Sequence, residues 1–226
     1  MINVTKEVLP AAVPEVMPEN QARAVVYNFL SSLFAKEVNE DLVSQLTSTQ
    51  GQSFLRSLAL EPTLAPSINV ISTELIKLNS KESLLELAAD FCGLFLVDGK
   101  TSVSPYAGQY INKNVTNTDT IKNKKSSDKT LIFGELHQLM MTFLTRSNIQ
   151  IHSEFPEPAD HIAVMLAYLA QLSLSASTKN QLDFIEMYLM TWLNDFTQQV
   201  IKHDPGCFYA ALAELTFEWI TLDIDN

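Results

Sequence analysis

The chain has 226 residues, of which 46% are hydrophobic and only six are glycine; it can bury a sizeable core, and it is poorly suited to a turn-rich β architecture. Its formal net charge of −11 and isoelectric point near 4.7 disfavour nucleic acid and anionic lipid as partners and favour basic segments. The two cysteines, Cys92 and Cys207, lie far apart in apolar segments, so we expect small buried side chains in a reducing cytoplasm.

The first 19 residues are expected to form a flexible N-terminal segment. They contain three prolines and lack a basic region followed by an apolar one, so they do not resemble a signal peptide. The longest apolar run of the chain, from Ile162 to Ala170, is too short to span a bilayer, and we therefore expect no membrane insertion.

Residues 20–110 show helical periodicity and are expected to form an N-terminal helical half. Asn20 is a suitable N-cap for the first helix, in which Tyr27, Leu33 and Phe34 have the spacing of core residues. Gly99 is expected to terminate the last long helix of this half. The predicted helices cover about 20–34, 40–48, 51–59, 67–78 and 83–97.

The helical pattern stops in a polar stretch rich in Asn, Thr, Ser and Lys, and we interpret residues 111–130 as a hinge or linker. Helical spacing returns at residue 131 and continues to the end, which predicts a C-terminal helical half over residues 131–226. The sequence contains no convincing pair of strands. The predicted fold is therefore an all-α, multi-helix bundle in two helical halves joined by a polar hinge.

The sequence EFPEPADH at residues 154–161 precedes the most apolar helix of the chain. Pro158 suits the first position of that helix, which would place Glu157 at its cap and Asp160 in its first turn. His161 near this helix start is expected to be neutral. Capping explains the two acids well, but it does not explain why a histidine follows them.

Two chemical roles for this stretch remain as alternatives. A metal could be bound by His152, Glu154, Glu157, Asp160 and His161, but no second Glu-x-x-His motif completes a di-iron pattern. A hydrolase could use Asp160 with His161, but adjacent helix residues point about 100° apart and no nucleophile elbow is present. Both alternatives are weaker than a non-catalytic, metal-free helix entrance.

Methionine and aromatic residues are concentrated in the C-terminal half. Such residues usually belong to a core, and the functional interpretation is an adaptable groove for an apolar or amphipathic peptide. The residues concerned are Met140, Met141, Met165, Met187, Met190, Tyr168, Tyr188, Trp192 and Trp219.

Four segments together resemble the TorD/DmsD family of redox-enzyme maturation chaperones. EPADH at residues 157–161 matches the E-P-x-D-H motif of that family, and PYAGQY at residues 105–110 falls where the family has a proline–aromatic segment before the hinge. YNFLSSLF at residues 27–34 and FYAALAELTFEW at residues 208–219 resemble the first and last helices of the family. The chain departs from the family pattern at residues 107–109, where AGQ replaces residues of the Glu-Ser type.

The resemblance implies a cytoplasmic chaperone that is not an enzyme and needs no cofactor. Such a protein would bind the twin-arginine leader peptide and the apo form of a molybdenum-cofactor reductase, of the trimethylamine-oxide or dimethyl-sulfoxide reductase type, until its cofactor is inserted. It could act as a monomer or as a dimer that exchanges halves through the hinge. The alternative is a small helical metal-binding protein or hydrolase that uses Glu157, Asp160 and His161.

The resemblance also implies where the leader peptide would bind. Asp160 and His161 are the expected recognition residues, and Glu157 and Pro158 are expected to shape the entrance. The proline–aromatic segment contributes Tyr106, and the apolar surface contributes Tyr168.

Overall fold

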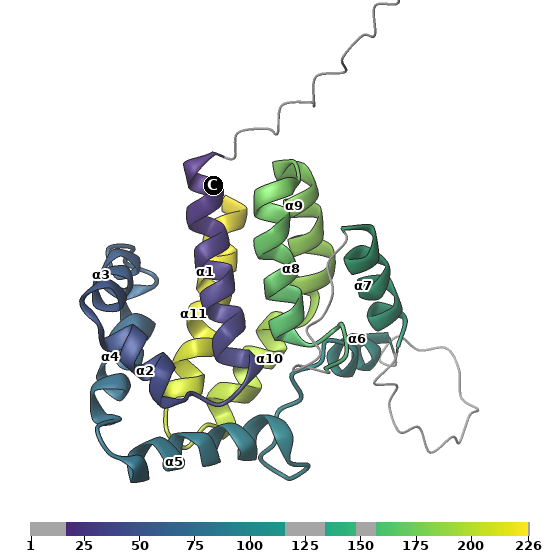
Figure 1. Ribbon diagram of the computed structural model, residues 1–226. Helices are drawn as coiled ribbons and strands as arrows, with labels where there is room; N and C mark the ends of the chain where they lie inside the picture. Colours follow the sequence, from purple (N-terminus) through teal and green to yellow (C-terminus); the bar gives the residue numbers. More distant parts are fainter. Residues whose placement is uncertain (1–16, 116–133, 148–156, 226) are drawn as a thin grey trace, which may run out of the picture.

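The computed structural model describes residues 17–115, 134–147 and 157–225, which form an all-α structure (Figure 1). No strand occurs among these residues, so the predicted fold class is confirmed. None of their helices is both long and apolar enough to cross a membrane. The first part of the chain forms α1 (Pro18–Ala35), α2 (Glu40–Thr47), α3 (Thr49–Leu58), α4 (Ala65–Lys77), α5 (Lys81–Phe91), the π-helical turn η1 (Cys92–Leu96) and α6 (Gly108–Val115). The second part forms α7 (Glu135–Arg146), α8 (Ile162–Ser175), α9 (Thr178–Phe184), the π-helical turn η2 (Ile185–Leu189), α10 (Met190–His203) and α11 (Phe208–Asp225).

Helix α1 lies at the centre of the molecule, with α8 beside it and α11 behind it in the view of Figure 1. Tyr27, Leu30 and Leu33 are completely buried on its inner face, as the spacing predicts. Helix α8 is buried around most of its circumference, because Ile162 and Leu169 and nearly all the residues between them lie in the core. The apolar run that is too short for a membrane is therefore a central core helix.

A cluster of aromatic rings closes the core where α1, α5, η1, α10 and α11 meet. The ring of Phe95 stacks on Phe196 with centroids 6.2 Å apart, and it meets Phe34 and Tyr209 edge to face. The ring centroids of Phe91 and Tyr209 lie 5.6 Å apart. Edge-to-face and offset arrangements of this kind contribute beyond the burial of apolar area, and they fix α5 against the C-terminal helices.

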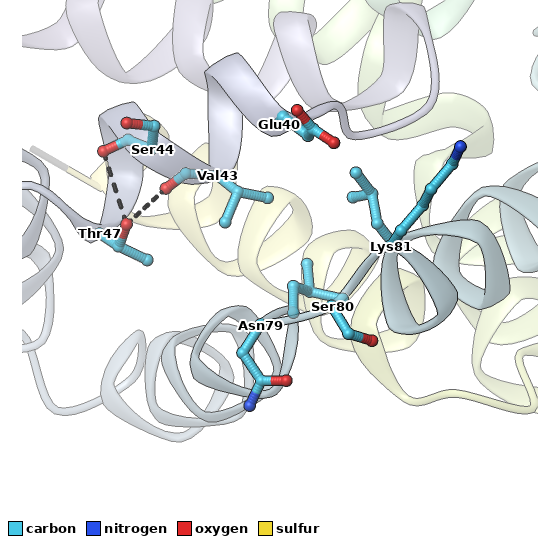
Figure 2. Close-up of a pocket in the computed structure, with 9 residues that line it drawn as sticks. Glu40, Val43, Ser44, Thr47, Asn79, Ser80 and Lys81 are labelled. Carbon is cyan, nitrogen blue, oxygen red and sulfur yellow. Dashed lines mark hydrogen bonds between the residues drawn. The ribbon is translucent and has the colours of Figure 1, made fainter.

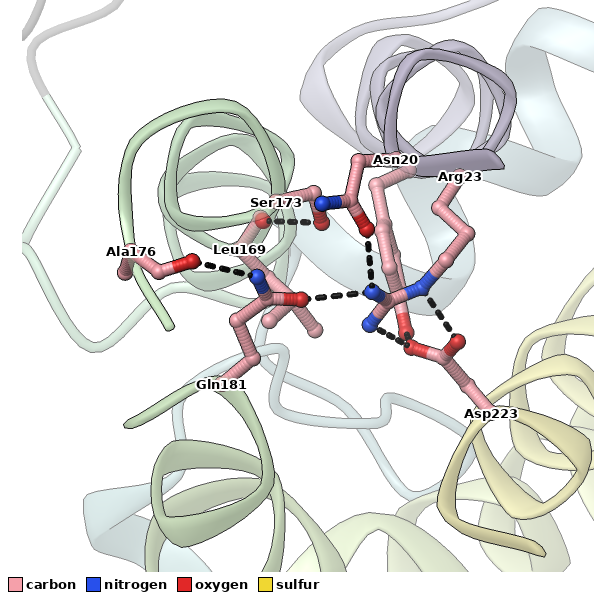
Figure 3. Close-up of polar contacts among 8 residues, drawn as sticks. Asn20, Arg23, Leu169, Ser173, Ala176, Gln181 and Asp223 are labelled. Carbon is pink, nitrogen blue, oxygen red and sulfur yellow. Dashed lines mark hydrogen bonds and ion pairs between the residues drawn. The ribbon is translucent and has the colours of Figure 1, made fainter. Parts of the chain in front are cut away.

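Polar contacts tie the first helix to the last (Figure 3). The Arg23 guanidinium donates to both carboxylate oxygens of Asp223, at 2.5 and 2.7 Å. It also donates to Gln181 in α9 at 2.6 Å and to Asn20 at 3.0 Å. Tyr27 donates its hydroxyl hydrogen to the same Asp223 carboxylate. One arginine thus joins α1, α9 and α11.

The start of the first helix differs from the prediction. The helix begins at Pro18, with Met17 as its N-cap residue and no side-chain cap, so Asn20 lies inside the first turn. Proline is favoured at this position because its fixed φ suits a helix and its missing N–H would be unpaired anyway. The oxygen of Asn20 accepts a hydrogen bond from Arg23 instead of capping the helix.

Two other local predictions were wrong. The helix formed by α5 and η1 ends at Leu96, and no glycine in the described residues has a positive φ, so Gly99 is not a left-handed cap. Cys207, predicted to be buried, is exposed and has φ 66°. Cys92 is only partly buried.

The predicted hinge lies mostly outside the described residues. Residues 111–115, the first part of it, belong to α6, and residues 116–130 are not described, nor are residues 1–16 of the N-terminal segment. The two predicted halves contact each other extensively, since α1 packs on α8 and α4 packs on α11. The division into two halves with a hinge between them stays a prediction.

Candidate functional site

Two segments far apart in the sequence form what we call the clasp, residues 105–108 and 157–162. The Ala107 N–H donates to the carbonyl of Asp160 at 3.1 Å, and the Ile162 N–H donates to the carbonyl of Pro105 at 2.9 Å. These bonds make an isolated antiparallel bridge between Tyr106 and His161. The clasp therefore brings the PYAG and EPADH sequences, which flank the predicted hinge, into direct contact.

Asp160 holds the clasp together through its carboxylate. One oxygen, Oδ2, accepts a hydrogen bond from the Gly108 N–H at 3.1 Å, at the start of α6. The other, Oδ1, is buried and has no hydrogen-bond partner in the described part of the chain. The side chain is 1% exposed, and burial raises the pKa of the carboxyl, although the bond from Gly108 opposes this shift.

His137 of α7 lies beside the carboxylate of Asp160. Its Nδ1 accepts a hydrogen bond from the Ala159 N–H at 2.9 Å and lies 3.9 Å from Oδ1 of Asp160. A nitrogen that accepts a hydrogen bond carries no proton of its own. The contact with Asp160 is therefore not a charge-assisted hydrogen bond, and the buried carboxylate has little compensation for its charge.

His161 caps α8. Its Nδ1 accepts a hydrogen bond from the Ala163 N–H at 3.1 Å, and its ring meets that of Tyr106 edge to face with centroids 5.2 Å apart. Burial lowers the pKa of the imidazole from 6.5 to about 4, so the ring is neutral, as the sequence predicts. The prediction that the helix begins at Pro158 was wrong, because α8 begins four residues later, at Ile162.

Glu157 and Pro158 form the outer, half-buried part of the clasp. The Tyr106 hydroxyl donates to Oε2 of Glu157 at 2.5 Å, and burial together with this bond raises the pKa of the phenol. Glu157 thus presents a carboxylate at the surface, whereas the carboxylate of Asp160 is enclosed.

An apolar groove of about 290 Å³ lies farther along α8, between α7, α9 and η2. The ring of Phe143 stacks on Tyr168 with centroids 5.9 Å apart and an interplanar angle of 7°. Met187 is 59% exposed on the side of η2. Asp183 adds a carboxylate to the wall. The lining residues are Phe143, Tyr168, Leu172, Asn180, Asp183, Phe184, Met187 and Tyr188.

A cavity of about 420 Å³ lies between α2 and the start of α5, and it contains none of the candidate residues (Figure 2). Two of its hydroxyl groups already form hydrogen bonds with backbone groups at the ends of helices. Thr47 donates to the carbonyl of Val43 at 2.8 Å, and the Ser80 hydroxyl accepts from the Ser83 N–H at 3.1 Å. This cavity therefore offers little to a ligand, and the clasp with the apolar groove is the better candidate site.

The metal alternative gains no support from the described residues. Within them, no three side chains of His, Cys, Asp or Glu are arranged to hold a metal ion. The Nδ1 lone pair of His161 is already used by the Ala163 N–H. His152 and Glu154, also considered as ligands, lie outside the described residues.

The comparison with known proteins was made on the whole chain. A family model described as nitrate reductase delta subunit matches residues 59–198. The chain is 61% identical over 221 residues to the chaperone protein TorD of Colwellia psychrerythraea, covering 93% of this chain and 94% of that protein. It is 50% identical over 208 residues to the chaperone protein TorD of Shewanella piezotolerans, covering 92% and 93%, and 33% identical over 223 residues to that of Vibrio vulnificus, covering 93% and 97%.

The chain belongs to the TorD family of chaperones. This confirms the resemblance that the EPADH and PYAGQY segments indicate in the sequence. It also confirms that the protein acts as a maturation chaperone and not as an enzyme.

Three residues of the site were missed in the sequence. His137 and Gly108 contact the EPADH segment, and Phe143 stacks on Tyr168 in the groove. In the clasp, His137 contacts a residue 22 positions away and Gly108 contacts one 52 positions away. No local spacing in the sequence could reveal contacts of this kind. The only available signal was the position of PYAG and EPADH on either side of the same polar stretch.

Proposed function

We propose that this member of the TorD family binds, in the cytoplasm, the twin-arginine leader peptide and the apo form of a molybdenum-cofactor reductase of the trimethylamine-oxide or dimethyl-sulfoxide reductase type. It would hold this client until the cofactor is inserted before export. The observation that carries the proposal is the apolar groove on α8, the helix that begins at the clasp containing the half-buried Glu157.

The groove suits the apolar stretch of a leader peptide. Its walls are aromatic rings and an exposed methionine, Met187, whose unbranched side chain can adapt to different apolar partners. Tyr168 forms the floor with Phe143 and is itself 6% exposed. An apolar segment lying there would cover Met187 and gain from its removal from water.

The clasp suits the arginines that precede the apolar stretch. Glu157 is half-buried and can accept hydrogen bonds from a guanidinium in addition to the one from Tyr106. Tyr168 is seven residues beyond His161 on the same helix, a rise of about 10 Å, which three extended peptide residues can span. A leader peptide could therefore contact both features at once.

Asp160 and His161 are proposed to act in recognition by positioning Glu157 and Tyr106. They are 1% and 4% exposed, so most of their surface is not accessible to a peptide. Their hydrogen bonds to Gly108 and Ala163 fix the backbone that carries Pro158 and Tyr106. We expect substitutions of these two residues to weaken peptide binding through the shape of the clasp.

The test is calorimetric titration of the protein with a synthetic twin-arginine leader peptide and with a second peptide in which both arginines are alanine. The wild-type protein should bind the first peptide more tightly, and the difference should shrink at high salt because surface charges are screened. Glu157→Gln should reduce the difference between the two peptides.

Two variants at equally exposed apolar side chains test the apolar part of the site. Met187→Ser should weaken binding of both peptides by about tenfold, the value expected for losing roughly one buried apolar side chain. Leu85→Ser serves as the control, because Leu85 is also 59% exposed but lies on α5. Equal affinity of both peptides for all four proteins would reject the proposed site.

A further inference from the structure

A cavity of about 500 Å³ lies where the start of α1, the turn between α3 and α4, and the end of α11 meet (Figure 1). We call it the α1–α11 pocket, after the helices that contribute Glu19 and Trp219 to its lining. It has no lining residue in common with the apolar groove on α8 and contains no residue of the clasp. Its size is within the range of cavities that bind ligands in proteins.

Part of the lining of the α1–α11 pocket is apolar. Leu58 and Leu64 are buried and line it from α3 and the turn that follows, and the half-buried Leu222 lines it from α11. The half-buried ring of Trp219 is held by an edge-to-face contact with Tyr27, with centroids 6.1 Å apart. Because the indole Nε1 is enclosed, the part of this ring that is exposed is carbon. An apolar side chain placed against these groups would gain from its removal from water.

The charged part of the lining consists of three carboxylates and one guanidinium, which gives a net charge of −2. Arg23 is already paired with Asp223 (Figure 3). Glu19, which is exposed, and Glu61, which is half-buried, form no ion pair within the described residues. The pocket therefore has two carboxylates whose charge is not balanced by a neighbouring cation.

Two further features of the α1–α11 pocket favour a positive charge. The last turn of α11, which supplies Leu222 and Asp223, contains no basic residue, so the negative end of the helix dipole is not compensated there. The face of an indole ring attracts lysine and arginine side chains, and Trp219 offers such a ring. The occupant that suits this lining thus combines an apolar side chain with positive charge.

We infer that the α1–α11 pocket binds a short segment of another polypeptide in which an apolar side chain is flanked by lysine or arginine. The apolar side chain would lie against Leu58, Leu64 and Trp219, and the basic side chains would contact Glu19 and Glu61. A second copy of this chain is a poor occupant, because each copy carries a net charge of −11. The inference does not depend on the site proposed for the leader peptide, since the two share no residue.

The test uses the only two tryptophans of the chain, labelled as fluorotryptophan and observed by fluorine NMR. Trp219 lines the pocket, whereas Trp192 is 1% exposed and lies outside it, so the Trp192 signal is an internal control. A Trp219→Phe variant assigns the two signals. The capped peptide KLLFK, which contains no tryptophan, should shift the Trp219 signal alone and saturate it at roughly millimolar concentration.

Two control peptides separate the charged and apolar contributions at constant ionic strength. The peptide ELLFE keeps the apolar residues and reverses the charge, and it should leave the Trp219 signal unchanged. The peptide KSSSK keeps the charge and removes the apolar residues, and it should bind at least about tenfold more weakly than KLLFK.

A matched pair of double variants tests the two glutamates. Glu19→Gln with Glu61→Gln should weaken binding of KLLFK by about tenfold, because it removes both unbalanced charges of the pocket. Glu82→Gln with Asp98→Asn should have no effect, because both residues are exposed and lie outside the pocket. Glu82 is the counterpart of Glu19, since each lies in the first turn of a helix. An unchanged Trp192 signal reports that each variant is folded.

Several results would overturn the inference. Equal affinity of the two double variants for KLLFK, or an equal shift with ELLFE, would show that the pocket does not recognise a basic segment. Loss of the Trp219 shift in Met187→Ser would show that the peptide acts from the groove on α8. If a chain lacking residues 1–16 has a shifted Trp219 signal without peptide, the pocket belongs to the N-terminal segment of the chain itself. A Trp219 signal that moves with protein concentration would assign it to a second copy.

Discussion

Asp160 is a carboxylate that the fold buries almost completely while pairing only one of its oxygens. Replacing it by alanine leaves the buried Gly108 N–H without an acceptor, which should cost about 1–3 kcal/mol of unfolding free energy. Asp160→Asn keeps an acceptor and removes the buried charge, so it should be as stable as the wild type at pH 7. Urea unfolding would measure the free energy of unfolding of both variants and of the wild type. An equal loss in the two variants would show that the charge itself is required.

His161 makes stability depend on pH in a definite direction. Its folded pKa of about 4 is below the unfolded value of 6.5, so the unfolded chain binds the proton more readily. Stability from this group is therefore complete above pH 6.5 and falls towards pH 4, by about 1.4 kcal/mol for each pH unit.

His161→Asn should remove this dependence while keeping the cap, because asparagine accepts the same kind of bond from the Ala163 N–H. Unfolding free energies from pH 7 to pH 4 would measure the difference between the two proteins. The raised pKa of Asp160 acts in the opposite direction in both proteins, so it largely cancels in that difference. If the unfolding free energies of the two proteins changed in parallel with pH, the pH dependence could not be assigned to His161.

At the scale of helices, the ion pair of Arg23 and Asp223 joins α1 to α11 with little exposure, 17% and 7% for the two side chains. Asp223→Ala removes the acceptor of the Tyr27 hydroxyl and of the Nε and Nη2 donors of Arg23, and it should cost about 2–3 kcal/mol of unfolding free energy. The pair Lys179 and Asp183 is the control, because it is exposed at 80% and 49%. Asp183→Ala should cost far less than Asp223→Ala in the same urea experiment, because water and salt screen an exposed pair.

Periodicity was enough to predict most helices, because burial of an apolar face decides where a helix forms. It was less informative about where helices begin and end. Pro158 and Asn20 both suit the starts of helices, yet α8 begins after His161 and α1 begins before Asn20. The start of α8 is set at the clasp, where His161 caps the helix, whereas α1 has no side-chain cap and begins at Pro18, whose fixed φ suits the first helical position. The bridge between Tyr106 and His161 depends on the whole fold and has no local signal.

At the scale of the whole molecule, the two predicted halves share one core. Helix α1 from the first half packs on α8 from the second, and the clasp joins the segments on either side of the predicted hinge. If the chain is cut at a protease sequence inserted between residues 117 and 129, the two pieces should remain together. They should elute from a sizing column at the volume of the intact protein and unfold in one transition. Separation of the pieces in native buffer would show that the halves are independent.

The same contacts are compatible with our proposal that the protein is a monomer or a dimer with exchanged halves. In an exchanged dimer, α1 of one copy would pack on α8 of the other, and Asp160 would accept from Gly108 of the partner. The free-energy cost of exchanging halves between two copies depends mainly on the connecting segment, since the contacts between the halves are the same in both forms.

The most direct test of the central claim is to map where a leader peptide binds. A twin-arginine leader carrying a photoreactive benzoylphenylalanine in its apolar stretch would be cross-linked to the protein, and the attachment site would be found by mass spectrometry. We predict attachment to the groove on α8, at Met187 or its neighbours on α7 and η2. Attachment confined to the surface formed by α2–α5 would contradict the account.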